Sequence, residues 1–115
     1  MSIEAHVIAI GPHDQDLAKH YEYAKSAYEH VPRGTEIVTQ ISQSFETANQ
    51  CRELAELFGA SLDDPASWVL DPSVDLSGHD SVLLESISAA DFEELQAAHA
   101  ALSEAGFRFF LRVDR

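Results

Sequence analysis

The sequence predicts an α+β fold, a two-layer sandwich with three helices mainly on one face of a four-stranded sheet. Apolar residues change period along the chain in the order β-α-β-α-β-α-β. The final segment, FRFFLRVDR at residues 107–115, alternates an apolar face with one that carries arginine and aspartate, as in a half-buried strand. With 115 residues and 45% hydrophobic content, we expect a single domain with one core.

The first half of the chain predicts two strands separated by a helix. Residues 3–10 are rich in β-branched side chains, and the strand they predict stops at Gly11-Pro12. In residues 35–43, successive side chains fall alternately on two faces, with Ile37, Thr39 and Ile41 on one of them, which predicts the second strand. Between them, spacings of four and three residues predict a helix whose apolar stripe consists of Leu17, Tyr21, Ala24, Tyr28 and Val31.

A capping box predicts where the second helix begins. Thr47 and Gln50 have the required spacing, and we expect the helix to run to Phe58 and to end at Gly59. Cys51, the only cysteine, has apolar helical neighbours and cannot form an internal disulfide. We therefore expect a buried thiol in this helix.

The second half predicts a third strand near residues 81–88, followed by a third helix. Ser88 is a typical N-cap residue, and Gly106 is a typical helix end. Between the second helix and the third strand, residues 59–80 predict a long loop. Asp64 and Pro65 within it predict a short helical turn that runs through Trp68, the only tryptophan.

Charge is the most informative feature for function. Twenty acidic and seven basic residues give a formal net charge of −13. No lysine or arginine lies between Arg52 and Arg108, whereas this span holds twelve carboxylates. Such a surface repels phosphate backbones and anionic lipid, so we expect neither nucleic-acid nor membrane binding. It favours a basic protein partner, because complementary charge speeds association.

One pattern near the N-terminus is compatible with a metal site. His13, Asp16 and His20 share a helical face if the helix begins before His13. If Asp14 is the N-cap, His13 lies outside the helix and the acidic residues complement the helix dipole instead. We favour the second interpretation, and we expect no metal and no cofactor.

Catalytic patterns are weak throughout the chain. His79, Asp80 and Ser81 are adjacent in sequence, which does not make a triad. No glycine-rich phosphate loop follows a strand. His99 shares a helical face with apolar residues, and we expect a hydrogen-bonded histidine at the edge of the core, with a general base as the alternative. The sequence therefore predicts no enzyme and no catalytic residues.

In size, acidity, single cysteine and lack of a catalytic motif, the chain resembles the small immunity proteins of bacterial toxin systems. The segments HVIAIGP and VPRGTEIVTQ match no immunity signature and are as similar to an uncharacterised bacterial family. The resemblance implies a cytoplasmic inhibitor that neutralises a basic toxin or enzyme. The start of the sequence, which lacks a basic leader and a long apolar run, also favours the cytoplasm.

Two alternatives to the inhibitor stay open. One is a small metal-binding or enzymatic domain that uses His13, Asp16 and His20, and the other is an adaptor or oligomeric scaffold. For the inhibitor, steering by charge around one aromatic anchor predicts where the partner binds. The predicted partner-binding residues are Asp63, Asp64, Trp68, Asp71, Asp75 and Asp80.

Overall fold

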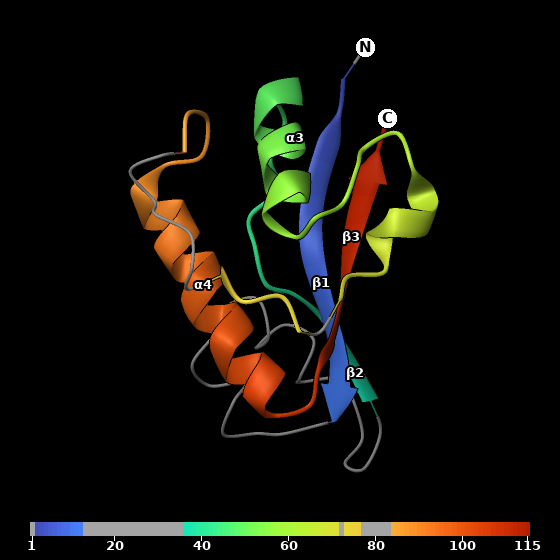
Figure 1. Cartoon of the computed structure of the whole chain (residues 1–115), viewed down its shortest axis with the longest axis vertical. Helices are drawn as coiled ribbons and strands as arrows, with labels where there is room; N and C mark the ends of the chain where they lie inside the picture. Colours follow the sequence, from blue (N-terminus) through green and yellow to red (C-terminus); the bar gives the residue numbers. More distant parts are fainter. Residues whose placement is uncertain (1, 13–35, 72, 77–83) are drawn as a thin grey trace.

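The chain is a small α+β protein whose computed structural model describes residues 2–12, 36–71, 73–76 and 84–115 (Figure 1). These residues contain three strands, two α-helices and one 3-10 helix, joined by loops and turns. In chain order they are β1 (Glu4–Pro12), β2 (Glu36–Gln40), α3 (Ala48–Leu57), η1 (Pro65–Trp68), α4 (Ala89–Glu104) and β3 (Arg108–Asp114).

The sheet has the order β2-β1-β3, and both pairs of strands are antiparallel. Ala9 of the central strand lies opposite Thr39 on one side and Phe109 on the other. Every second residue of β1, from Ala5 to Gly11, is buried. Successive side chains of a strand point to opposite faces of the sheet, and these residues lie on the face that packs against the core. The alternation read from residues 107–115 is confirmed, since Phe107, Phe109 and Leu111 are buried.

Side-chain caps set the start of both α-helices as the sequence predicts. Thr47 Oγ1 accepts a hydrogen bond from the backbone N–H of Gln50, and Ser88 Oγ accepts one from the backbone N–H of Asp91. Both helices end next to a glycine with positive φ, Gly59 at 70° and Gly106 at 88°.

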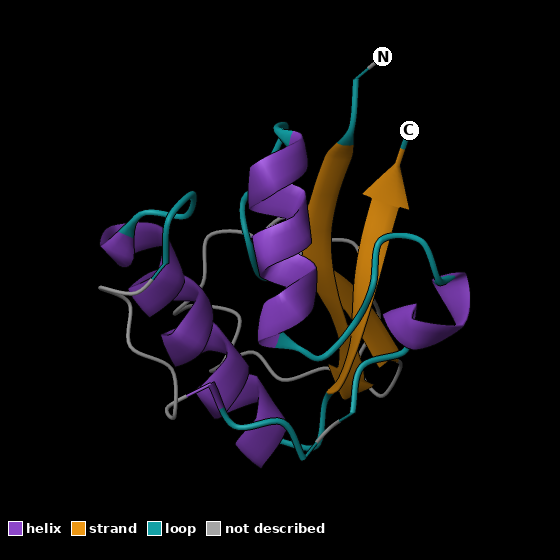
Figure 2. Cartoon of the chain, turned by 45° about the horizontal axis from the view of Figure 1, so that its top comes forward, coloured by secondary structure: helices purple, strands orange, loops and turns teal. Residues whose placement is uncertain are grey.

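The core lies between the helices and one face of the sheet (Figure 2). Cys51 and Leu54 of α3 are fully buried, and Phe92, Leu95 and Leu102 of α4 are buried in the same cluster. Burial of such side chains stabilises the fold by about 1.5–3 kcal/mol each. Within the described residues, neither helix is long and apolar enough to cross a membrane.

The predicted four-stranded sheet with three helices in β-α-β-α-β-α-β order is wrong. The structure has three antiparallel strands and two α-helices in the part of the chain it describes. Residues 85–87 of the predicted third strand form bends, and their backbone N–H groups have a different partner. The carboxylate of Glu53 on α3 accepts hydrogen bonds of 3.1–3.2 Å from the backbone N–H groups of Glu85, Ser86 and Ile87. The Glu53 carboxylate thus accepts the hydrogen bonds that the carbonyl groups of a neighbouring strand would otherwise accept.

Part of the predicted loop at 59–80 is regular structure. η1 follows Asp64, whose carboxylate accepts from the backbone N–H of Ala66, as the sequence predicts. The chain then runs beside β3, where the N–H of Leu70 donates to the carbonyl of Phe109 at 3.0 Å. The predicted helix over residues 14–31 lies outside the described residues.

Candidate functional site

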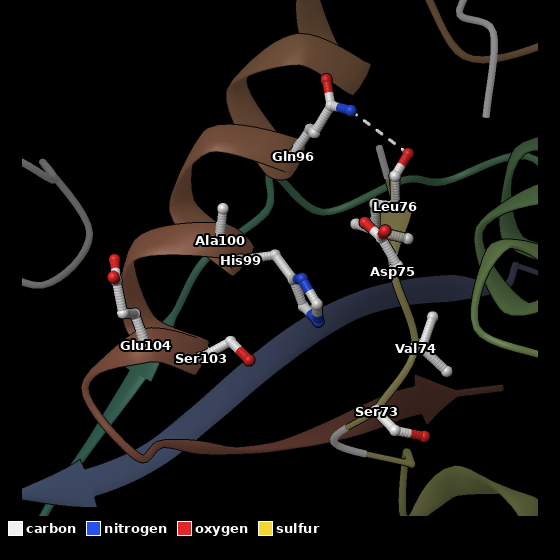
Figure 3. Close-up of a pocket in the computed structure, with 9 residues that line it drawn as sticks. All are labelled: Ser73, Val74, Asp75, Leu76, Gln96, His99, Ala100, Ser103 and Glu104. Atoms are coloured by element: carbon white, nitrogen blue, oxygen red, sulfur yellow. Dashed lines mark hydrogen bonds between the residues drawn. The ribbon is translucent and has the colours of Figure 1, made fainter. Parts of the chain in front are cut away.

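A cavity of about 360 Å³ lies between α4 and residues 73–76 (Figure 3). Residues 73–76 form one wall, and one face of α4 forms the other. Because residues three and four apart share a face of a helix, the α4 wall follows from the sequence spacing. The residues of α4 in this wall are Gln96, His99, Ala100, Ser103 and Glu104.

His99 is the most buried of the polar residues that line the cavity. The residue is only 4% exposed, and its ring packs between two aromatic rings. The ring centroids lie 5.5 Å from Phe58 and 4.4 Å from Phe109. Nε2 has no hydrogen-bond partner among the described residues, whereas we expected a hydrogen-bonded histidine from the sequence.

Burial controls the protonation of His99. Removal from water disfavours the charged imidazolium and lowers the pKa of His99 below its ordinary value of 6.5. The carboxylate of Asp75, on the facing wall, acts in the opposite direction and raises this pKa by a smaller amount. His99 is therefore neutral at pH 7, with one ring nitrogen as a donor and the other as an acceptor.

A hydrogen bond joins the two walls of the cavity. The amide Nε2 of Gln96 donates to the carbonyl of Leu76 at 3.2 Å (Figure 3). Leu76 is buried in the core, whereas Val74 is only partly buried. The buried Leu76 side chain and this hydrogen bond both help to hold residues 73–76 against α4.

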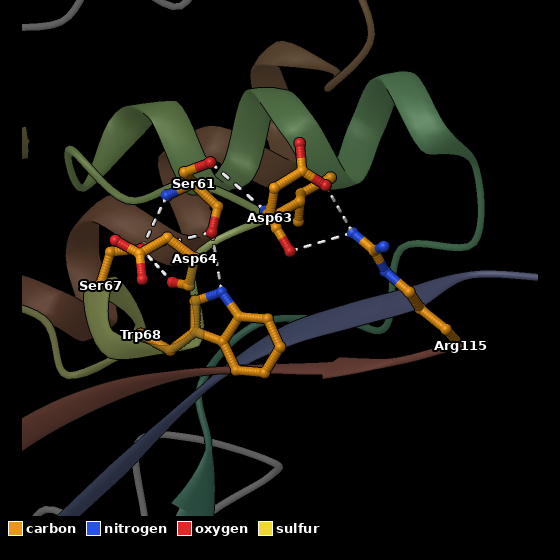
Figure 4. A network of polar contacts seen from close by, with 7 residues as sticks. Ser61, Asp63, Asp64, Ser67, Trp68 and Arg115 are labelled. Carbon is orange, nitrogen blue, oxygen red and sulfur yellow. Dashed lines mark hydrogen bonds and ion pairs between the residues drawn. The ribbon is translucent and has the colours of Figure 1, made fainter.

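The predicted partner-binding residues around η1 form a separate group at the other side of β3 (Figures 1 and 4). Asp63 is largely exposed and makes an ion pair of 3.3 Å with Arg115. Asp64 caps η1, as described above. The indole N–H of Trp68 donates to the carbonyl of Ser61 at 2.8 Å, and its ring packs partly against the core.

The remaining predicted residues lie toward the cavity. Asp71 Oδ1 accepts hydrogen bonds from both the backbone N–H and the hydroxyl of Ser73. Both bonds lower the pKa of Asp71 below its usual value, and the bond from the backbone N–H has the larger effect. Asp75 is exposed and lines the cavity. Asp80 lies outside the described residues, so the predicted set falls into two groups, one at η1 and one near the cavity.

The metal-site hypothesis for His13, Asp16 and His20 falls on residues outside those described. Within the part of the chain that the structure describes, no group of three His, Cys, Asp or Glu side chains is placed to hold a metal ion. The two carboxylates of the cavity wall therefore do not combine with His99 into such a group.

Sequence reasoning found His99 and Asp75 separately but missed the cavity that joins them. The spacing of His99 to Gln96 and Ser103 marks one helical face, and that signal was present in the sequence. The facing wall could not be found in this way, because residues 73–76 meet α4 only through tertiary packing. The role of Glu53 was missed for the same reason, since its partners lie more than thirty residues away.

Comparisons with known proteins leave the family of this chain open. No protein-family model, curated protein or solved structure matches it. The resemblance to immunity proteins therefore stays a prediction.

Proposed function

We propose that the chain is a small acidic protein-binding module that neutralises a basic toxin or enzyme, as an immunity protein does. The observation that carries this proposal is the charge of residues 63–75, here called the aspartate segment. It contains Asp63, Asp64, Asp71 and Asp75, all exposed, and no lysine or arginine. A basic partner gains from this charge in both association rate and specificity.

Local hydrogen bonds hold two carboxylates of this segment, those of Asp64 and Asp71, in place before a partner arrives. Asp64 and Asp71 each accept from backbone N–H groups two residues ahead. Fixed carboxylates lose less conformational freedom on binding, which supports affinity. The lowered pKa of Asp71 also keeps this carboxylate charged at mildly acidic pH.

Trp68 is the aromatic anchor in this proposal. Its indole N–H is already satisfied by Ser61, so a partner that covers the ring leaves no buried donor unpaired. The ring is partly exposed, and Asp63 and Asp64 precede it in the chain. An aromatic side chain with polar neighbours is typical of the energetic centre of a protein interface.

The same charge argues against other classes of partner. A formal net charge of −13 disfavours nucleic acid and anionic membrane surfaces. We propose a cytoplasmic location, where an inhibitor of a basic enzyme would protect the cell that makes it.

Capture from the native lysate tests the proposal, with the tagged chain as bait at about 50 mM and about 500 mM salt. We expect a basic protein that is retained at low salt and eluted as salt rises. The test variant carries asparagine at Asp63, Asp64, Asp71 and Asp75, and it should retain much less of that protein.

A second variant controls for total charge. Glutamine at Glu46, Glu56, Glu93 and Glu94 removes the same four charges from exposed positions outside the aspartate segment. It should retain the partner nearly as well as the unchanged protein. Equal loss by both variants, or no basic protein captured, would overturn the proposal.

A further inference from the structure

The sheet has an apolar band on the face turned away from the described helices, which pack on its other face (Figure 2). Residues opposite each other in antiparallel strands share a face of the sheet. Val38 of β2 therefore lies beside Ile10 of β1. In the next row, Phe110 of β3 lies between Ile8 of β1 and Val69. Val38 and Val69, at the two margins, are 54% and 68% exposed. These five residues are here called the outer band, and exposed apolar residues gathered in this way mark a surface that binds another protein layer.

β3 carries charged residues on the same face as the outer band. Alternate residues of a strand share a face, so this face of β3 presents Arg108, Phe110, Arg112 and Asp114 in that order. The three charged residues are exposed, and Phe110 is partly buried. Glu4, which lies opposite Asp114 on β1, adds a second carboxylate at the same end. Two arginines thus flank Phe110, and carboxylates lie at one end of the face.

The order of these residues on β3 is complementary to its own reverse. When two copies of β3 face each other in opposite directions, Arg108 of one copy lies opposite Asp114 of the other. In the middle, Arg112 of one copy lies opposite Phe110 of the other. The first contact is an ion pair, the second places a guanidinium over an aromatic ring, and a two-fold axis repeats both.

Contacts within one chain leave room for this arrangement. Arg112 and Asp114 of the same chain are 3.9 Å apart and both side chains are mostly exposed, so this ion pair is weak. Arg108 has an interaction within its own chain. Its guanidinium has five N–H donors, so it can keep that interaction and also bind a carboxylate of a second copy.

We propose that this face of the sheet is the interface of a symmetric homodimer. The two sheets pack face to face with their strands in opposite directions, so that the outer bands of the two copies overlap at the two-fold axis. Sheets packed in this way keep their strands within about 30° of each other, which lets the reversed order of β3 match along its four outward residues. The dimer does not rest on the proposed function, because it uses the sheet face and not the carboxylates of the aspartate segment.

The size of the face predicts a weak dimer. Strands about 4.8 Å apart and outward residues about 6.8 Å apart give roughly 500 Å² of interface per subunit. Stable interfaces bury about 800 Å² per partner, and transient ones bury less. The net charge of −13 on each copy also opposes association. We therefore expect a Kd of about 10–100 µM at about 150 mM salt.

Sedimentation equilibrium measures this Kd over about 5 µM to about 1 mM protein, and we expect monomer at the low end and mostly dimer at the high end. Val69→Lys places a charge in the outer band through an exposed side chain, so it should raise the Kd at least about tenfold and leave the fold intact. Ala66→Lys adds the same charge at an exposed position of η1 outside the outer band, and it should leave the Kd nearly unchanged.

A charge exchange on β3 tests the direction of the two strands. Arg108→Asp and Asp114→Arg each place like charges opposite each other, and each should raise the Kd about threefold to tenfold. The two changes shift the net charge in opposite directions, so an effect of total charge cannot weaken both. The double variant pairs opposite charges again and has the original net charge, and it should recover most of the affinity.

Three results would overturn the dimer: monomer throughout the concentration range, equal weakening by Val69→Lys and Ala66→Lys, or a double variant that associates no better than the single variants. These results leave capture of a basic protein through the aspartate segment intact. Conversely, a dimer with the expected variant behaviour and no captured partner would refute the proposed function and keep the homodimer.

Discussion

The ring of His99 lies 4.4 Å, centroid to centroid, from the ring of Phe109, at an interplanar angle of 36°. This contact joins α4 to β3 and sets a titratable group inside the core. An apolar neighbour offers the imidazolium no hydrogen bond, so protonation of His99 opposes folding. The same ring also forms the inner wall of the cavity, which links stability to the candidate site.

We expect the protein to lose stability as pH falls below about 6.5. Burial lowers the pKa of His99 in the folded state, so the unfolded chain binds more protons there. The stabilising effect is complete above the unfolded pKa of 6.5 and is lost as pH falls toward the folded pKa. Urea unfolding at about pH 7.5 and about pH 5.5 measures the difference.

His99→Phe is the matched variant for this pH dependence. It keeps an aromatic ring and removes the proton site, so the loss of unfolding free energy between the two pH values should shrink. Part of the dependence should stay, because burial and Arg112 also lower the pKa of His6. A variant with the full pH dependence of the unchanged protein would show that His99 does not carry it.

We expect Gly11→Ala to destabilise the fold by about 1–3 kcal/mol, because there is no room for a methyl group. A Cβ on Gly11 would lie 2.5 Å from Cγ of Phe107, whose ring is buried. Thermal or urea unfolding measures the change. In Phe107→Leu the same glycine substitution should cost less, and an equal cost in both backgrounds would mean that the ring contact is not the cause.

We expect Glu53→Gln to cost about 1–3 kcal/mol, since the carboxylate accepts from the N–H groups of Glu85, Ser86 and Ile87. An amide leaves one oxygen to accept and turns an NH₂ toward the same donors. Glu56→Gln on the same helix is the control, because the contact of Glu56 with Arg52 is long, at 4.0 Å, and both side chains are exposed. It should change stability by less than about 0.5 kcal/mol. If both variants unfold alike, Glu53 does not organise residues 85–87.

Cys51 should react slowly with a thiol reagent such as Ellman's reagent in the folded protein. The residue is fully buried, and burial raises the pKa of its thiol, so little thiolate is exposed. Its Sγ lies 3.3 Å from the carbonyl of Phe45. The reaction should become fast in urea, and immediate stoichiometric labelling in native buffer would contradict this placement.

The predictions from sequence that proved correct rest on residues close together in the chain. The caps at Thr47, Asp64 and Ser88 each need one side chain and a backbone N–H two or three residues ahead. The buried face of β3 follows from strict alternation. Such signals are local, so one sequence is enough to find them.

The incorrect part depends on contacts between distant residues. The segment near residues 81–88 has apolar content typical of a strand, but Glu53 accepts the hydrogen bonds of the N–H groups of residues 85–87. Neither the β2-β1-β3 order nor the antiparallel pairing can be read from periodicity. The cavity also depends on contacts between distant residues, since Asp75 and His99 come to line it only when α4 packs on residues 73–76.

The rate of association with the captured partner tests the central claim most directly. Stopped-flow mixing would follow the fluorescence of Trp68, the only tryptophan of this chain, as salt is varied. We predict that the rate constant falls at least about tenfold between about 50 mM and about 500 mM salt, and that the four-aspartate variant starts lower with a weaker dependence. A rate constant independent of salt, or equal in that variant and the unchanged protein, would contradict a function based on the aspartate segment.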